Sequence, residues 1–137
     1  MNSILLDTNV LVYAIDSNSQ FNIRSQAIFQ KQDVELFTTS KNISEFLSVV
    51  TRGENSYFNI DDALNIVEDI ASTMNIVFPN QYSFEIFQRL LKSYKPKGLK
   101  IHDIEIISIA LAHNVNNIAT FNVKDFSNIN EISLVQV

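Results

Sequence analysis

The chain has 137 residues, of which 46% are apolar and 18% are charged, and its formal net charge is −5. This composition excludes a disordered chain and predicts a single globular domain over residues 1–137. The absence of cysteine excludes disulfides and thiolate metal sites, and the negative net charge argues against a protein that holds nucleic acid mainly by bulk attraction.

Strand-like and helix-like segments alternate along the chain. Apolar runs predict strands at residues 3–6, 35–39, 74–78, 117–120 and 132–136. Apolar spacing of three and four residues and capping residue types predict helices at residues 9–16, 21–32, 41–52, 60–73, 80–95 and 103–114. This alternation is typical of βαβ units, so we expect an α/β fold with a mainly parallel sheet of about five strands.

The first predicted strand ends at an acid. Ile4–Leu6 is continuously apolar, as in a strand covered on both faces, and Asp7, Thr8 and Asn9 follow it directly. Ligands of open α/β sheets bind just beyond the carboxyl ends of strands, which places Asp7 where chemistry is expected. A purely structural alternative is that Asp7 caps the following helix.

Acids and amides recur after later strands. Glu45 lies in the early turns of the third helix, and Asp103 opens the apolar sixth helix. The strand that ends at Thr120 is followed by Asn122 and Asp125. Each acid also has a structural alternative, since Glu45 could be an exposed helix residue, Asp103 a helix N-cap, and Asp125 the start of a turn.

Gathering Asp7, Glu45 and Asp103 in one cleft requires a counterion. Two carboxylates 4 Å apart repel by about 4 kcal/mol at an effective dielectric of 20. Oxygen ligands favour Mg²⁺ or Mn²⁺, whereas His102 and His113 are eleven residues apart and form no zinc-binding pair. With only two glycines, the chain has no phosphate-binding glycine loop, which excludes P-loop and Rossmann nucleotide binding.

A basic segment stands out in the otherwise acidic chain. Five basic side chains and no acid lie between residues 89 and 100: Arg89, Lys92, Lys95, Lys97 and Lys100. Pro96 and Gly98 indicate a loop within the segment, and Tyr94 adds an aromatic ring. Such a segment could follow an RNA phosphate backbone, or could simply be solvated surface.

Four motifs in a fixed order resemble those of the PIN-domain ribonucleases, most of whose small members look like VapC-type toxins of toxin–antitoxin pairs. The motifs are Leu5–Tyr13, Ser44–Phe46, His102–Asp103 and Ala119–Phe126. The resemblance covers essentially the whole chain and implies a PIN-like three-layer α/β/α fold. It also implies that Asp7, Glu45 and Asp103 bind Mg²⁺ or Mn²⁺, with Thr8, Asn9 and Thr120 as supporting residues. The family's fourth acidic position is variable, and here either Asn122 or Asp125 could fill it.

The resemblance further implies a metal-dependent endoribonuclease that hydrolyses RNA phosphodiester bonds by means of a metal-activated water. Expected partners are an RNA substrate, held by the basic segment, an antitoxin protein, and a second copy of the chain. No basic leader and no apolar run of membrane-spanning length is found, so we expect a cytoplasmic protein that does not bind a membrane.

Three other functions are alternatives to this one. An RNA-processing PIN nuclease without an antitoxin would use the same chemistry in another biological role. A non-catalytic PIN-like module would bind RNA or a protein partner, which the amide at Asn122 favours. A phosphatase with Asp7 as the nucleophile is disfavoured, because that chemistry needs an acid two residues later, where Asn9 stands.

Overall fold

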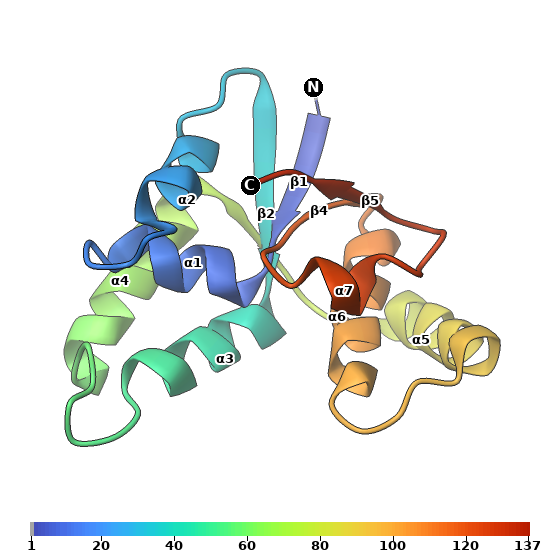
Figure 1. The fold of residues 1–137 in the computed structure, drawn as a ribbon. Coiled ribbons are helices and arrows are strands. Elements are labelled where there is room, and N and C mark those ends of the chain that lie inside the picture. The colour runs from blue at the N-terminus through green and yellow to red at the C-terminus, as the bar shows by residue number, and fades with distance from the viewer. Residues whose placement is uncertain (1) are drawn as a thin grey trace.

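The computed structural model describes residues 2–137, and its centre is an all-parallel sheet in the order β3-β2-β1-β4-β5 (Figure 1). The strands are β1 (Asn2–Leu6), β2 (Val34–Thr39), β3 (Asn75–Val77), β4 (Asn117–Ala119) and β5 (Ser133–Val135). All five predicted strands are confirmed, with each end within one residue of its predicted position. The parallel direction is also confirmed.

Helices cover both faces of this sheet. They are α1 (Thr8–Ile15), α2 (Asn22–Phe29), α3 (Ser40–Val50), α4 (Ile60–Thr73), α5 (Gln81–Tyr94), α6 (Lys100–Ala112) and α7 (Val123–Phe126). Figure 1 shows α1 to α4 on one side of the sheet and α5 and α6 on the other. The three-layer α/β/α fold is therefore confirmed.

The continuous apolar run of β1 follows from this two-sided cover. Ile4 and Leu6 belong to a core cluster with residues of α1 to α4, whereas Leu5, which points to the opposite face, packs with Ile106 and Ala110 of α6. From Ile4 to Leu6 the strand is buried on both faces, so this part has no position for a polar side chain until the strand ends.

The order in which strands are added to the sheet reverses between the neighbouring strands β1 and β4. From β1 the chain builds β2 and β3 on one side, then crosses over and builds β4 and β5 on the other. A reversal of this kind leaves a crevice at the carboxyl ends of the two central strands, where ligands of open α/β sheets bind. Asp7 follows β1 and Thr120 follows β4, so both lie at this crevice.

Three helices differ from the prediction, of which α2 ends at Phe29, three residues before its predicted end. α6 begins at Lys100, three residues early, after Gly98 adopts a left-handed conformation with φ 62°, so that Asp103 lies in the first turn and is not an N-cap. α7 was not predicted, since four residues are too few to show helical periodicity, and it contains Asp125, which therefore does not begin a turn. None of the helices within residues 2–137 has the length and apolar character needed to cross a bilayer.

Candidate active site

Asp7 is buried at the carboxyl end of β1, with 6% of its surface exposed. Its Oδ1 accepts a hydrogen bond from the backbone N–H of Thr8 at 2.9 Å, which makes it the N-cap of α1. The capping role proposed as a structural alternative is thus real. It uses only one of the lone pairs of the carboxylate and is compatible with a second role.

Three side chains also donate hydrogen bonds to this carboxylate. Thr120 Oγ1 donates to Oδ2 at 2.7 Å, Asn9 Nδ2 donates to Oδ2 at 3.4 Å, and Asn42 Nδ2 donates to Oδ1 at 3.3 Å. They come from α1, α3 and the residue after β4, so Asp7 is fixed from both sides of the switch point. Donors alone surround it, and donors stabilise the charged form of a carboxylate.

Asn42 is a site residue that the sequence analysis did not single out. Its Nδ2 also donates to Thr8 Oγ1 at 3.0 Å, and Thr8 Oγ1 donates in turn to Glu45 Oε2 at 2.9 Å. Its Oδ1 accepts from Thr39, which completes a capping box at the start of α3. The available signal was its spacing, because Asn42 lies four residues before the buried Phe46 and so shares its face of the helix.

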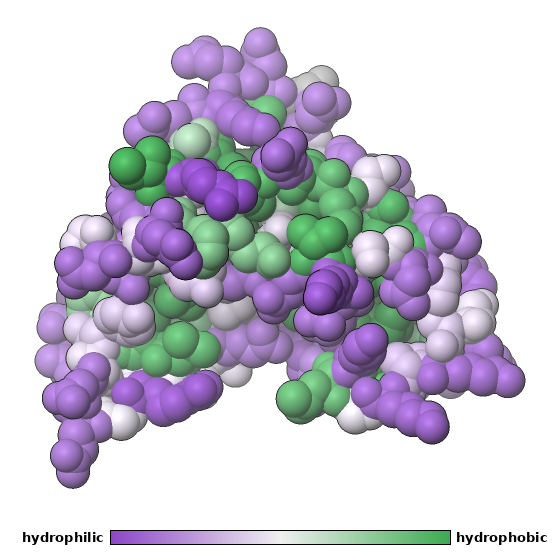
Figure 2. Space-filling view, viewed as in Figure 1, coloured by the Kyte–Doolittle hydropathy of each residue, from purple (hydrophilic) through white to green (hydrophobic). Residues whose placement is uncertain are grey.

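Asp7, Glu45, Asp103 and Asn122 line one cleft of about 360 Å³, which also includes Thr8 and Asn9 and is hereafter the acidic cleft. Figure 2 shows the molecule hollowed at its lower edge, between the part built from α3 and the part built from α6 and α7, with mostly hydrophilic side chains around the hollow. Residues separated by more than one hundred positions in the sequence meet here. Their roles in binding and catalysis stay predictions.

The charges within the cleft disfavour one another. Burial, together with the charges of Asp7, Asp125 and Glu45, raises the pKa of Asp103 to about 6, against the lowering effect of Lys100. Burial likewise raises the pKa of Asp7, although hydrogen bonds from Thr120, Thr8 and Asn42 oppose it and Glu45 adds to it. Without a counterion the fold therefore favours protonation of acids that the sequence predicts to be metal ligands.

The donors in the cleft are of the type that suits a hard divalent cation. They are carboxylate and amide oxygens, which Mg²⁺ and Mn²⁺ prefer. Within residues 2–137, no three Asp, Glu, His or Cys side chains form a group that could hold a metal ion together. Mg²⁺ commonly takes one or two protein carboxylates and keeps several waters, and the cleft fits a site of that kind.

Asn122 and Asp125, the two candidates for the fourth position, lie differently. Asn122 lines the acidic cleft, and its backbone N–H donates to Thr120 Oγ1 at 3.0 Å. Asp125 lines a neighbouring hollow instead, yet it is close enough to Asp103 for its charge to raise the pKa of that residue. The structure therefore brings the amide, and not the carboxylate, to the cleft surface.

The basic segment of residues 89–100 is only partly a loop, because its first half belongs to α5. Arg89 and Lys92 are exposed residues of α5, because that helix continues to Tyr94. Lys95, Lys97 and Lys100 line the hollow that also contains Asp125. The five basic residues thus form two groups, of which one faces a concavity.

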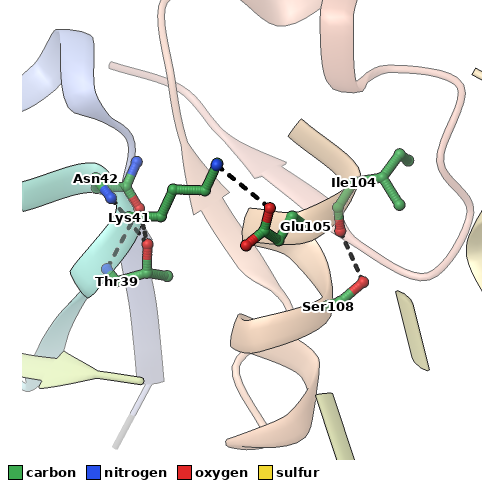
Figure 3. A network of polar contacts seen from close by, with 6 residues as sticks. All are labelled: Thr39, Lys41, Asn42, Ile104, Glu105 and Ser108. Atoms are coloured by element: carbon green, nitrogen blue, oxygen red, sulfur yellow. Dashed lines mark hydrogen bonds and ion pairs between the residues drawn. The ribbon is translucent and has the colours of Figure 1, made fainter. Parts of the chain in front are cut away.

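A single ion pair is found within residues 2–137, and it joins α3 to α6. Lys41 Nζ lies 3.3 Å from Glu105 Oε1, and Figure 3 shows the lysine side chain reaching from one helix to the other. Glu105 lies two residues after Asp103 on α6, and this pair gives it a structural partner. His102 is exposed, and His113 Nδ1 lies 2.8 Å from the carbonyl oxygen of Ile109 at the end of α6.

Three solved structures illustrate what the fold is similar to. VapBC2 from Rickettsia felis, bound to a DNA fragment from its promoter, and VapBC-1 from nontypeable Haemophilus influenzae each align with a TM-score of 0.73, at 19% and 20% identity respectively. Both cover 98% of this chain, and the match covers 98% and 97% of theirs. VapC20 from Mycobacterium tuberculosis, a toxin that cleaves the sarcin–ricin loop, aligns with a TM-score of 0.69 at 8% identity over 90% of this chain and 93% of its own.

Comparison at the level of sequence gives the family. No curated protein sequence matches the chain at a significant level. The sequence model of the PIN domain matches residues 4–132, a span that contains the acidic cleft, the last three residues of β1, and all of β2, β3 and β4. By this match, and in agreement with the three-layer fold, the chain belongs to the PIN domain family.

Proposed function

We propose that the chain is a divalent-metal-dependent endoribonuclease that acts as the toxin of a VapBC-like, type II toxin–antitoxin pair. The observation that carries the proposal is the sharing of one cleft by Asp7, Glu45 and Asp103, which come from three different elements at the switch point of the sheet. Membership of the PIN domain family and the likeness in fold to VapC toxins support it.

The chain would contribute positioned oxygen ligands. Asp7 is held by four donors, so its carboxylate needs little reorganisation to bind a cation. Thr8 orients Glu45, and Asp103 faces the same cleft from α6. Mg²⁺ or Mn²⁺, when bound, lowers the pKa of a coordinated water and offsets negative charge on a phosphate.

The negative net charge of the chain is compatible with an RNA substrate. Neutralising the acids of the cleft removes the charge that would repel a phosphodiester. The lysines at residues 95, 97 and 100 add local positive charge on the side of α6 next to Asp103. Local charge, and not the net charge of −5, then decides whether the RNA backbone approaches.

An antitoxin and a second copy of the chain are the proposed partners. The Rickettsia felis and Haemophilus influenzae structures are VapBC assemblies, in which a PIN-fold chain of similar length accompanies its partner. Co-expression with the product of an adjacent small reading frame should yield a complex that suppresses cleavage. Light scattering of the isolated chain should give twice the mass of 15.6 kDa.

One observation favours a second candidate, a PIN-like module without catalysis. The residue that lines the cleft near Asp103 after β4 is Asn122, an uncharged amide, where the family resemblance implies an acid. A site with three acids binds a divalent cation less tightly than a site with four. The RNA-processing nuclease without an antitoxin differs from the proposal only in its partner, so it is separated by the co-expression test.

The test is cleavage of end-labelled total RNA by the purified chain with Mg²⁺, with Mn²⁺ and with EDTA. The matched control is Asp7→Asn, which keeps the size of the side chain and the N-cap but removes the charge. Fragments that need the metal and vanish in the control would support the nuclease, and their termini would give the target.

A folded, antitoxin-free protein that cuts no RNA in either metal would contradict the proposal. The binding module would then be the better description. Exchange of Asn122 for alanine tests the fourth position in the same assay, because a role in metal binding predicts a higher Mg²⁺ concentration for half-maximal cleavage.

A further inference from the structure

A second hollow, of about 580 Å³, opens on the other side of the first turn of α6. Three exposed lysines at its rim, Lys95, Lys97 and Lys100, lead us to name it the basic hollow. It shares no lining residue with the acidic cleft. The proposed function uses these lysines only as general positive charge and gives the concavity itself no role.

The floor of the basic hollow is apolar. Ile104 and Ile129 line it and are buried, with 3% and 5% of their surfaces exposed. Leu99 at the rim is 82% exposed, so a large apolar side chain stands in water beside the opening. A flat apolar group placed between Leu99 and this floor would remove apolar surface from water.

Polar groups and unpaired charge complete the lining. Asn128 offers an amide with both a donor and an acceptor, and Asp125 offers a carboxylate. Within residues 2–137 the one ion pair joins Lys41 to Glu105, so none of the three rim lysines forms an ion pair, although Lys100 lowers the pKa of Asp103 and Asp125 lies in the same hollow. In a chain with a net charge of −5, this rim is a local site for an anion.

The two hollows are direct neighbours. Asp103 lines the acidic cleft, and the next residue, Ile104, lines the basic hollow. Both belong to the first turns of α6, where consecutive side chains point about 100° apart, so the two concavities lie on adjoining sides of the same helix. A strand whose backbone crosses the acidic cleft can therefore continue toward the basic hollow.

We propose that the basic hollow binds one nucleotide of the RNA strand, flanking the phosphodiester that lies in the acidic cleft. The base packs on the apolar floor with Asn128 at its edge, and the lysines contact its phosphate. This inference rests on the proposed function and deepens it, because a pocket that holds a base gives the enzyme a preference for sequence next to the cut. Stacking and amide contacts to unpaired bases are the usual basis of such a preference in RNA recognition.

The experiment measures binding apart from cleavage. Asp7→Asn protein is titrated in EDTA against fluorescently labelled single-stranded RNA hexamers of different base composition, and anisotropy reports affinity. Lys95→Gln/Lys97→Gln removes two charges from the hollow. Arg89→Gln/Lys92→Gln removes two charges from α5, outside it, and is the matched control. Lys100 is left intact because it acts on the pKa of Asp103.

We expect the hollow variant to bind RNA about tenfold more weakly and the control variant less than about threefold more weakly. Asn128→Ala should change the ranking of the hexamers by base while keeping the slope of affinity against salt, because it carries no charge. All these positions are exposed, so folding is checked simply by circular dichroism.

Equal losses in the two double variants would mean bulk attraction and would overturn the proposal, as would no loss in either. An acidic peptide that fails to displace the labelled RNA agrees with the proposal. If the peptide binds the basic hollow and RNA does not, the hollow is a site for a protein partner and the proposal is wrong. If the unmodified chain cleaves RNA with metal but both double variants lose affinity equally, the role of the hollow is rejected and the nuclease proposal stands. If only the hollow variant loses affinity and no cleavage is found, RNA binding by the hollow stands and the nuclease proposal is rejected.

Discussion

Lys41 and Glu105 form an ion pair of 3.3 Å that ties the first turn of α3 to the second turn of α6 (Figure 3). Lys41 lies four residues before Glu45, and Glu105 lies two residues after Asp103. Each partner is therefore on a helix that presents an acid to the cleft. The pair holds these helices together on the outside of the site.

Replacing Lys41 with glutamine should lower the kcat/KM of RNA cleavage while changing the free energy of unfolding only slightly. Both side chains are partly exposed, 23% for Lys41 and 36% for Glu105, so the pair contributes less than about 1 kcal/mol to the free energy of unfolding. Its removal nevertheless frees α3 to move relative to α6. The measurement is kcat/KM of Lys41→Gln beside Glu105→Gln. The charge-exchanged double variant, Lys41→Glu/Glu105→Lys, should recover activity, and a double variant as poor as the single ones would argue against this role.

Thr120→Ala should destabilise the protein by roughly 1–3 kcal/mol, the usual cost of leaving buried polar groups without a partner. The hydroxyl is buried, donates to Asp7, and accepts from Asn9 Nδ2 at 3.2 Å and from the Asn122 N–H at 3.0 Å. Thr120→Ser keeps all three bonds and serves as the control in urea denaturation. Equal losses for both variants would show that the methyl group, and not the hydroxyl, is what stabilises the fold.

Asn42→Asp should be more harmful at neutral pH than at acidic pH. The amide that donates to Asp7 Oδ1 at 3.3 Å would be replaced by a carboxylate of nearly the same shape, and two charges at this distance repel by up to about 4 kcal/mol. Protonation relieves the repulsion as the pH falls. Asn42→Ala, which loses only hydrogen bonds, should cost a similar amount at pH 5 and pH 7.5. Denaturation curves at both values compare the two variants, and parallel behaviour would contradict the expectation.

Asp7→Asn should abolish cleavage and leave the thermal midpoint in EDTA equal or higher. Burial and Glu45 raise the pKa of Asp7, which means that ionisation of this carboxyl is less favourable in the folded protein than in the unfolded chain. An asparagine presents a neutral group of the same size. Differential scanning fluorimetry of both proteins tests this, and a midpoint well below that of the unmodified chain would show that the charge itself holds the fold.

Asp103 should make the metal-free protein less stable as the pH rises through 6. Its pKa is raised by burial, and by neighbouring acids, from 3.8 to about 6 in the folded state, so its favourable contribution is complete below pH 3.8 and is lost as the pH passes 6. Asp103→Asn lacks this dependence. The gain in the free energy of unfolding from the substitution should therefore grow between pH 4.5 and pH 7.5. Asp125→Asn should shift the change to lower pH, since the charge of Asp125 contributes to the raised pKa. A gain that is constant with pH would contradict the assignment.

The sequence was sufficient for the sheet and for the acids of the cleft. The reason is that the buried ends of β1 and β4 have no room for charge until the strands end, and Asp7 and Thr120 are the first polar residues after them. Glu45, Asp103 and Asn122 then join them once the order of the strands brings their elements to the same edge.

The partners of these acids depended on packing that no local pattern reveals. Asn42 donates to Asp7 only because α3 packs next to α1, and Lys41 meets Glu105 only because the first turns of α3 and α6, on opposite faces of the sheet, approach each other at its edge. The division of the basic segment follows from the end of α5 at Tyr94, which the predicted helix over residues 80–95 places to within one residue.

The bond between Thr120 and Asp7 joins residues 113 positions apart, across the two central strands of the sheet. Such long-range pairing forms late, because the intervening chain must be ordered first. During synthesis, β1 can pair with β2 before β4 is made, but a nascent chain shorter than about 120 residues lacks the Thr120 hydroxyl that donates to Asp7. The completed site therefore forms only when nearly the whole chain has emerged from the ribosome.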